Sequence, residues 1–164
     1  NKVLIYRYFG GFPGLAEHWA KTSSFWPSEL ELIGHDPDEF AQLSVRERVI
    51  TVLGNYMSAV RGRPLTVEAL AGELLRPHDT TRALSEARVR PGKGVGDYNQ
   101  LEKADKDISE RVWRMIFITA ALTAFFSIRE RNNPEYLGLD FSEDETWNFV
   151  RDIVAEIATA YLKD

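Results

Sequence analysis

The sequence predicts a mainly α-helical domain of about six or seven helices packed around a buried hydrophobic helix at residues 112–128. Three observations support this fold class. Apolar residues recur at steps of three and four in several segments, capping residues precede those segments, and the one run with strand composition has no comparable run to pair with. With 164 residues, 44% of them apolar, we expect residues 1–164 to form one domain, either complete or cut from a longer protein.

The first 40 residues are the least regular part of the chain. Residues 3–9 are β-branched and aromatic and run into a segment rich in Gly and Pro at 10–14, which predicts an extended or short-strand N-terminal arm; the start of a helix is the alternative. Residues 15–21 have the spacing of a short helix. Pro27, Gly34 and Pro37 then divide the following segment into short helices and turns.

The first long helix is expected to begin after Ser44. Ser44 and Glu47 have the spacing of a capping box, and apolar residues recur with helical period until Gly62. Two shorter helices should follow, one capped by Thr66 and ended by Pro77, the other beginning at Asp79 or Thr80 and ending near residue 88.

Residues 112–128 are apolar on almost every side of a helix. The uninterrupted stretch between Arg114 and Arg129 is 14 residues long, short of the ~20 that span a bilayer. We therefore expect a central buried helix and no membrane insertion. A last helix should follow Ser142, because Glu143 and the two acidic residues after it suit the positive end of a helix dipole.

Composition excludes several classes of protein. The formal net charge is −5 and the chain has no Cys, which excludes disulfide scaffolds, thiolate metal sites and Cys nucleophiles. No targeting segment is evident. These features lead us to expect a soluble, acidic, cytoplasmic protein.

No motif for catalysis, cofactor binding or metal binding is present. The three histidines, His18, His35 and His78, are scattered, without the spacing of metal ligands on a helix. The Gly-rich segment 92–97 contains a Lys, but neither a preceding strand nor a following Ser or Thr makes it a P-loop. We predict no catalytic, cofactor or metal residues; the sequence makes no positive case for an enzyme and leaves open whether the protein has catalytic activity.

Residues 66–90 have the arrangement of a helix-turn-helix. In that motif the start of the second helix enters the major groove of DNA, and Arg and Thr side chains there contact phosphates and base edges. The candidate nucleic-acid-binding residues are Arg76, Thr80, Thr81, Arg82, Ser85, Arg88, Arg90 and Lys93. An ordinary helix pair with a solvated basic face is the alternative, because the turn carries no Gly.

Aromatic residues crowd the first 26 positions, more than one short helix can bury. Either they wrap the core, or part of them forms an anchor for a partner, since Trp and Tyr dominate the energetics of interfaces. The candidate partner-binding residues are Tyr6, Arg7, Tyr8, Phe9, Phe12 and Trp26.

The leading hypothesis is a non-enzymatic regulatory domain that binds a protein partner, in the manner of an inhibitor, immunity protein or adaptor. Residues 76–93 carry a net charge of +3 and residues 135–164 carry −6, so the acidic C-terminal helix suits a basic partner. The first alternative is a DNA-binding regulator that uses 66–90. The second is a small-ligand binder or enzyme with a cavity beside Trp113, Phe117 and Phe125. The sequence leaves the oligomeric state open.

Overall fold

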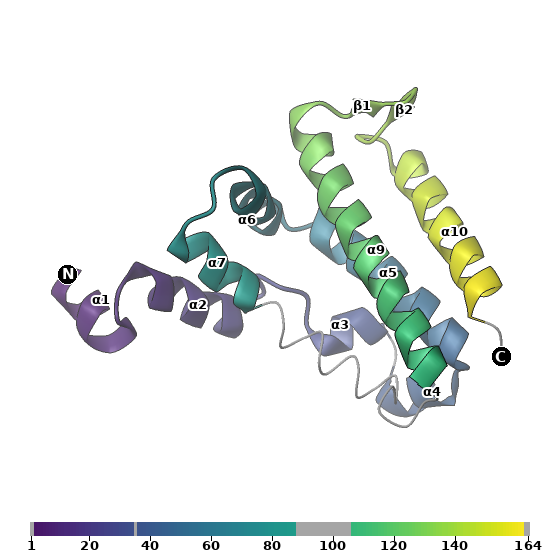
Figure 1. Cartoon of the computed structure of the whole chain (residues 1–164), viewed down its shortest axis with the longest axis horizontal. Helices are drawn as coiled ribbons and strands as arrows, with labels where there is room; N and C mark the ends of the chain where they lie inside the picture. The colour runs from purple at the N-terminus through teal and green to yellow at the C-terminus, as the bar shows by residue number, and fades with distance from the viewer. Residues whose placement is uncertain (1, 35, 88–105, 163–164) are drawn as a thin grey trace.

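The computed structural model describes residues 2–34, 36–87 and 106–162, and helices dominate it (Figure 1). The mainly α-helical fold class is confirmed. In chain order the elements are α1 Lys2–Phe9, α2 Phe12–Thr22, α3 Glu29–Ile33, α4 Pro37–Gln42, α5 Val45–Arg61, α6 Pro64–Leu75, α7 Asp79–Glu86, α9 Lys106–Asn132, β1 Glu135–Tyr136, β2 Leu139–Asp140 and α10 Asp144–Tyr161.

Helix α5 is the centre of the fold, because α3, α6, α9 and α10 all pack against it. It begins as its sequence predicts: the Ser44 hydroxyl accepts a hydrogen bond from Glu47 N, and the Glu47 carboxylate accepts one from Ser44 N at 2.8 Å. These bonds satisfy two backbone donors that a helix start otherwise leaves free. Its buried side chains include Val49, Leu53 and Met57.

The N-terminal arm is helical, so the prediction of an extended or short-strand arm is wrong. Helix α1 satisfies its backbone polar groups internally, which an isolated strand cannot do. None of its residues is buried, and it packs on α2 (Figure 1). The division of residues 22–40 into short helices is confirmed by α3 and α4.

Gly34 shows why this region turns where it does. It ends α3 with a φ of 64°, in the left-handed region that favours glycine. A Cβ here would also lie 2.5 Å from Nδ2 of Asn55, which donates a hydrogen bond to the Leu32 carbonyl at 3.0 Å. The glycine therefore lets α3 end directly against α5.

Helices α9 and α10 run antiparallel in front of α5, joined by a two-stranded hairpin (Figure 1). The hairpin pairs Tyr136 with Leu139, and its two turn residues, Leu137 and Gly138, both have positive φ. The largest core cluster lies between the three helices and contains Phe141, which stacks on Phe126 with ring centroids 4.1 Å apart. The hairpin thus closes one end of the α5–α9–α10 layer.

Candidate functional site

Helix α9 carries four large apolar side chains on its outer face. Its buried positions are Val112, Met115, Thr119, Thr123 and Ser127, so hydroxyl-bearing residues fill much of the face that the protein covers. Trp113, Phe117, Ile118 and Phe125 are exposed, Phe117 at 76%. Met115, Ile116 and Phe126 of the same helix pack in the core, but the outer face departs from the polar surface that the hydrophobic effect favours for a helix in water.

The prediction of a helix buried on all sides at 112–128 is therefore wrong. Small side chains on the inner face of α9 lie against α5 and α6, while no described element covers the outer face. The centre of the fold is α5 instead, because four helices surround it.

Helix α10 exposes a second apolar stripe beside the first. Phe149, Ile153 and Ile157 follow one another at steps of four, the spacing that places side chains on one side of a helix. The next step is Tyr161, whose hydroxyl accepts a hydrogen bond from Nη1 of Arg114 on α9 at 3.0 Å. Tyr161 therefore lies on the flank of α10 that faces α9, and Ile157, one step before it, lies next to that flank.

The register of the two helices brings these residues together. Because α9 and α10 are antiparallel, steps of four from the Arg114–Tyr161 contact place Ile118 level with Ile157. At the other end, Phe126 of α9 lies 6.5 Å from Trp147 of α10, between ring centroids, which fits the same register. We call Phe117, Ile118, Phe125, Phe149, Ile153 and Ile157 the α9–α10 face.

The charges of the two helices have opposite sign. Helix α9 contains five basic and three acidic residues, and α10 contains one basic and four acidic residues. The α9–α10 face therefore lies between a helix of net charge +2 and a helix of net charge −3.

One helix of the described residues, α9, is long and apolar enough to cross a membrane by length and composition alone, with 28% of its most apolar window buried. Core helices of soluble proteins pass the same test. The absence of membrane insertion therefore stays a prediction.

The candidate nucleic-acid-binding residues that the structure describes lie around the α6–α7 turn. Arg76 and Arg82 are exposed, and Thr80 is half-buried. Thr81 is buried, and its hydroxyl donates to the His78 carbonyl at 2.9 Å within the cap of α7. Ser85 donates to Glu73 at 2.8 Å. The hydroxyl groups of Thr81 and Ser85 are thus hydrogen-bonded within the protein.

The exposed side of α7 does not concentrate positive charge. Arg82 lies between Asp79, at 3.8 Å, and the exposed Glu86, and α2 packs against another side of the helix. Arg88, Arg90 and Lys93 lie outside the described residues, so the basic segment as a whole stays a prediction.

Most of the candidate partner-binding residues lie on an exposed surface. Tyr6, Arg7, Tyr8 and Phe12 are exposed, Tyr8 at 69%, and Phe9 is half-buried. Arg7 lies 5.9 Å from the centre of the Tyr8 ring, within the range of a cation–π contact. Helix α1 therefore presents aromatic rings and positive charge together.

Trp26 is the exception, and its assignment to a partner-binding set is corrected by the structure. Its side chain is 5% exposed in a core cluster with Phe25 and Leu70. Its indole Nε1 donates a hydrogen bond to the Leu84 carbonyl at 2.8 Å. A tryptophan with a buried ring and a hydrogen-bonded indole N–H inside the protein contributes to the packing of the core.

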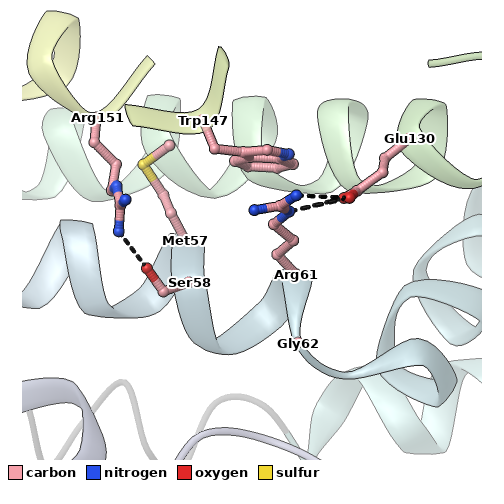
Figure 2. A pocket seen from close by; sticks show the side chains of 7 residues that line it. All are labelled: Met57, Ser58, Arg61, Gly62, Glu130, Trp147 and Arg151. Carbon is pink, nitrogen blue, oxygen red and sulfur yellow. Dashed lines mark hydrogen bonds and ion pairs between the residues drawn. The ribbon is translucent and has the colours of Figure 1, made fainter. Parts of the chain in front are cut away.

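A pocket of about 280 Å³ lies on the opposite flank of α10, where α10 meets α5 (Figure 2). Arg61 crosses its floor: its guanidinium binds Glu130 of α9 at 3.0 Å and Asp144 of α10 at 2.5 Å, and lies 5.2 Å from the Trp147 ring centre. Partial burial lowers the pKa of Arg61, but hydrogen bonds to the two carboxylates outweigh it and raise the pKa above its ordinary value.

This pocket is not the cavity expected beside Trp113, Phe117 and Phe125, which lie on the exposed side of α9. Within the described ranges, no three His, Asp or Glu side chains lie close enough together to hold a metal ion. Sequence reasoning missed Arg61, Glu130 and Arg151, because they come from three helices and share no local motif.

Comparisons with known proteins add no family or structural relative. The chain matches no family model, no curated protein and no solved structure.

Proposed function

We propose that this protein is a non-enzymatic protein-binding domain whose α9–α10 face joins it to a second copy of the same chain. The observation that carries the proposal is the apolar outer face of α9, where Phe117 and Ile118 are exposed while Thr119 and Thr123 are buried on the inner face. Large exposed apolar patches mark interaction surfaces in soluble proteins. Covering this face removes apolar area from water.

The shape of the face favours a helical partner. Two antiparallel helices with apolar stripes at steps of four present ridges and a groove, into which another pair of helices packs as a four-helix bundle. Ile118 is 50% exposed and Ile157 48% exposed, so a partner that covers both helices meets aliphatic side chains from each of them.

The charges favour a second copy over an unrelated chain. When an identical pair packs across a two-fold axis parallel to the helices, each α9 comes to lie beside the α10 of the other copy. The net charges of these helices, +2 and −3, then attract. The same surface patch serves both partners, as a two-fold interface requires.

The test is the molar mass in solution by size-exclusion chromatography with light scattering. We expect the wild type to show twice the chain mass of 18.7 kDa. Ile157→Glu should give the monomer, because a carboxylate in an apolar contact is expensive to desolvate. The matched control is Leu65→Glu: Leu65 of α6 is 61% exposed, against 48% for Ile157, and this variant should keep the mass of the wild type.

A wild type that is still monomeric at about 50 μM would contradict the proposal, because a stable interface should hold two copies together at that protein concentration. So would equal dissociation of both variants. If the wild type partitions into phosphatidylcholine vesicles and Ile157→Glu does not, the α9–α10 face binds a lipid surface and not a second copy of the chain.

A further inference from the structure

Helix α1 forms one end of the molecule, and none of its residues is buried (Figure 1). Its place on α2 depends on Gly14, because a Cβ at that position would clash with the carbonyl oxygen of Phe9. The Phe9 ring lies against His18 of α2, with ring centroids 5.3 Å apart. Ile5 lies one helical turn before Phe9, and both are half-buried. These two side chains therefore mark the side of α1 that faces α2.

The other side of α1 is both apolar and cationic. Val3 and Arg7 lie one helical turn apart, and so do Leu4 and Tyr8, which places these four side chains away from α2. Val3 is 70% exposed and Tyr8 is 69% exposed. Lys2 and Arg7 are the charged residues of the helix, and both are exposed. Aliphatic, aromatic and basic groups thus share one surface, and α1 contributes no acidic group to it.

The charges of the protein are separated along its longest axis. Residues 2–22 contain three basic residues and one acidic residue, a net charge of +2, whereas α4 carries −2 and α10 carries −3. Figure 1 places α1 at one end of the axis and the two acidic helices toward the other. An anionic surface therefore attracts α1 and repels α4 and α10, which orients the molecule with α1 toward that surface.

The size of α1 favours a lipid surface over a protein partner. A standard protein interface takes about 20–30 residues from each side, whereas α1 has 8 residues. A membrane surface needs no complementary shape, because a few apolar side chains enter it while Lys and Arg bind the anionic headgroups. Tyrosine is enriched at the boundary between headgroups and acyl chains, where its ring is in an apolar environment and its hydroxyl meets water.

We propose that α1 binds the surface of a membrane that contains anionic phospholipid. Val3, Leu4 and Tyr8 enter the boundary between headgroups and acyl chains, and Lys2 and Arg7 contact the headgroup anions. The helix lies on the membrane and does not cross it, because 8 residues are far fewer than the roughly 20 that span a bilayer. Binding requires no second copy of the chain, since α10 lies at the other end of the molecule (Figure 1).

The test is co-sedimentation with vesicles of equal parts phosphatidylcholine and phosphatidylserine, compared with vesicles of phosphatidylcholine alone. We expect binding to the neutral vesicles to be at least about tenfold weaker, because each basic side chain near an anionic surface contributes about fivefold in affinity. For the same reason Arg7→Gln should weaken binding to the anionic vesicles about fivefold. Leu4→Gln should weaken it about tenfold, because it removes an aliphatic side chain from the lipid contact.

Two exposed residues outside α1 provide the matched controls. Arg82→Gln removes a charge that is 70% exposed on α7, and Leu75→Gln removes a leucine that is 78% exposed on α6. Both variants should bind as the wild type does. Circular dichroism of each variant establishes that it is folded, as expected for exposed positions.

A single label reports which part of the protein meets the lipid. Because the chain contains no Cys, Tyr8→Cys and Leu75→Cys each create one site for an environment-sensitive fluorophore. On anionic vesicles the emission of the label at position 8 should shift to shorter wavelength, whereas that of the label at position 75 should not change.

Three results would overturn the proposal: no binding to the anionic vesicles at about 1 mM lipid, well above the concentration at which such contacts saturate; equal binding to neutral and anionic vesicles; or wild-type binding by both Arg7→Gln and Leu4→Gln. A lower molar mass of Arg7→Gln without vesicles would also overturn it, because α1 would then contact a second copy. Each binding measurement is repeated on Ile157→Glu, so that failure of lipid binding is distinguishable from failure of self-association.

Discussion

Replacing Arg61 by Met should lower the free energy of unfolding by about 3 kcal/mol. The pair with Glu130 is the main contribution, because both side chains are only 22% exposed and Nε and Nη2 of Arg61 each lie within 3.1 Å of the carboxylate. A charge-assisted pair of this kind contributes about 1.5–3 kcal/mol. The contact with Trp147 adds about 1 kcal/mol. Asp144 is largely exposed, so its pair adds little.

The assay is urea unfolding followed by far-UV circular dichroism, on Arg61→Met, Glu130→Gln and the double variant. Because the two groups bind each other, the double variant should be more stable than the sum of the single losses predicts, by about 1–2 kcal/mol. A loss below about 1 kcal/mol for Arg61→Met, or a coupling below about 0.3 kcal/mol, would refute the view that this arginine joins α5 to α9.

Four further changes test other parts of the fold by the same urea assay. Ser44→Ala should lower the free energy of unfolding by about 1 kcal/mol, because it removes the cap of α5. A loss below about 0.3 kcal/mol would contradict this prediction. Hydrogen bonds from the Ser44 backbone and hydroxyl lower the pKa of Glu47, so its stabilisation is complete above the unfolded pKa of about 4.3 and disappears as pH falls through the lower folded value; Glu47→Gln should flatten the profile there, and an unchanged profile would count against the box. Thr119→Val should raise stability by up to about 1 kcal/mol, because the buried hydroxyl of Thr119 has no partner among the described residues, whereas a clear loss would reveal one. Phe141→Ala should cost about 3–5 kcal/mol, since this ring is buried against Phe126; a cost under about 1.5 would mean that the cluster repacks.

Where local chemistry decides a feature, the sequence was sufficient. The capping box at Ser44 and the end of α5 at Gly62 are as predicted, because both depend on residues within one helical turn. The hairpin was missed because its local sequence lacks the usual signal. Its turn residues, Leu137 and Gly138, have positive φ, and Leu is not a residue that indicates such a turn. Its place is set by packing, with Phe141 buried directly after it.

Composition gave the wrong prediction in two segments where it is compatible with more than one structure. Residues 2–9 have the β-branched and aromatic content of a strand, yet they form α1, because a strand needs a partner and a helix does not. Residues 112–128 are apolar on almost every side of a helix, and such a pattern does not identify the side that the protein covers. The packing of α9 against α5 made Thr119 an inner residue and Phe117 an outer one.

The sequence by itself determined a helical protein, the boundaries of its central helix and a strongly acidic C-terminal segment, since each depends on neighbours along the chain. Tertiary structure alone decided the α9–α10 face and the arginine pocket. Ile118 and Ile157, like Arg61 and Arg151, are distant in sequence, and only the antiparallel packing of α9 and α10 on α5 makes them neighbours. Both features are therefore properties of helix packing, which a linear pattern does not record.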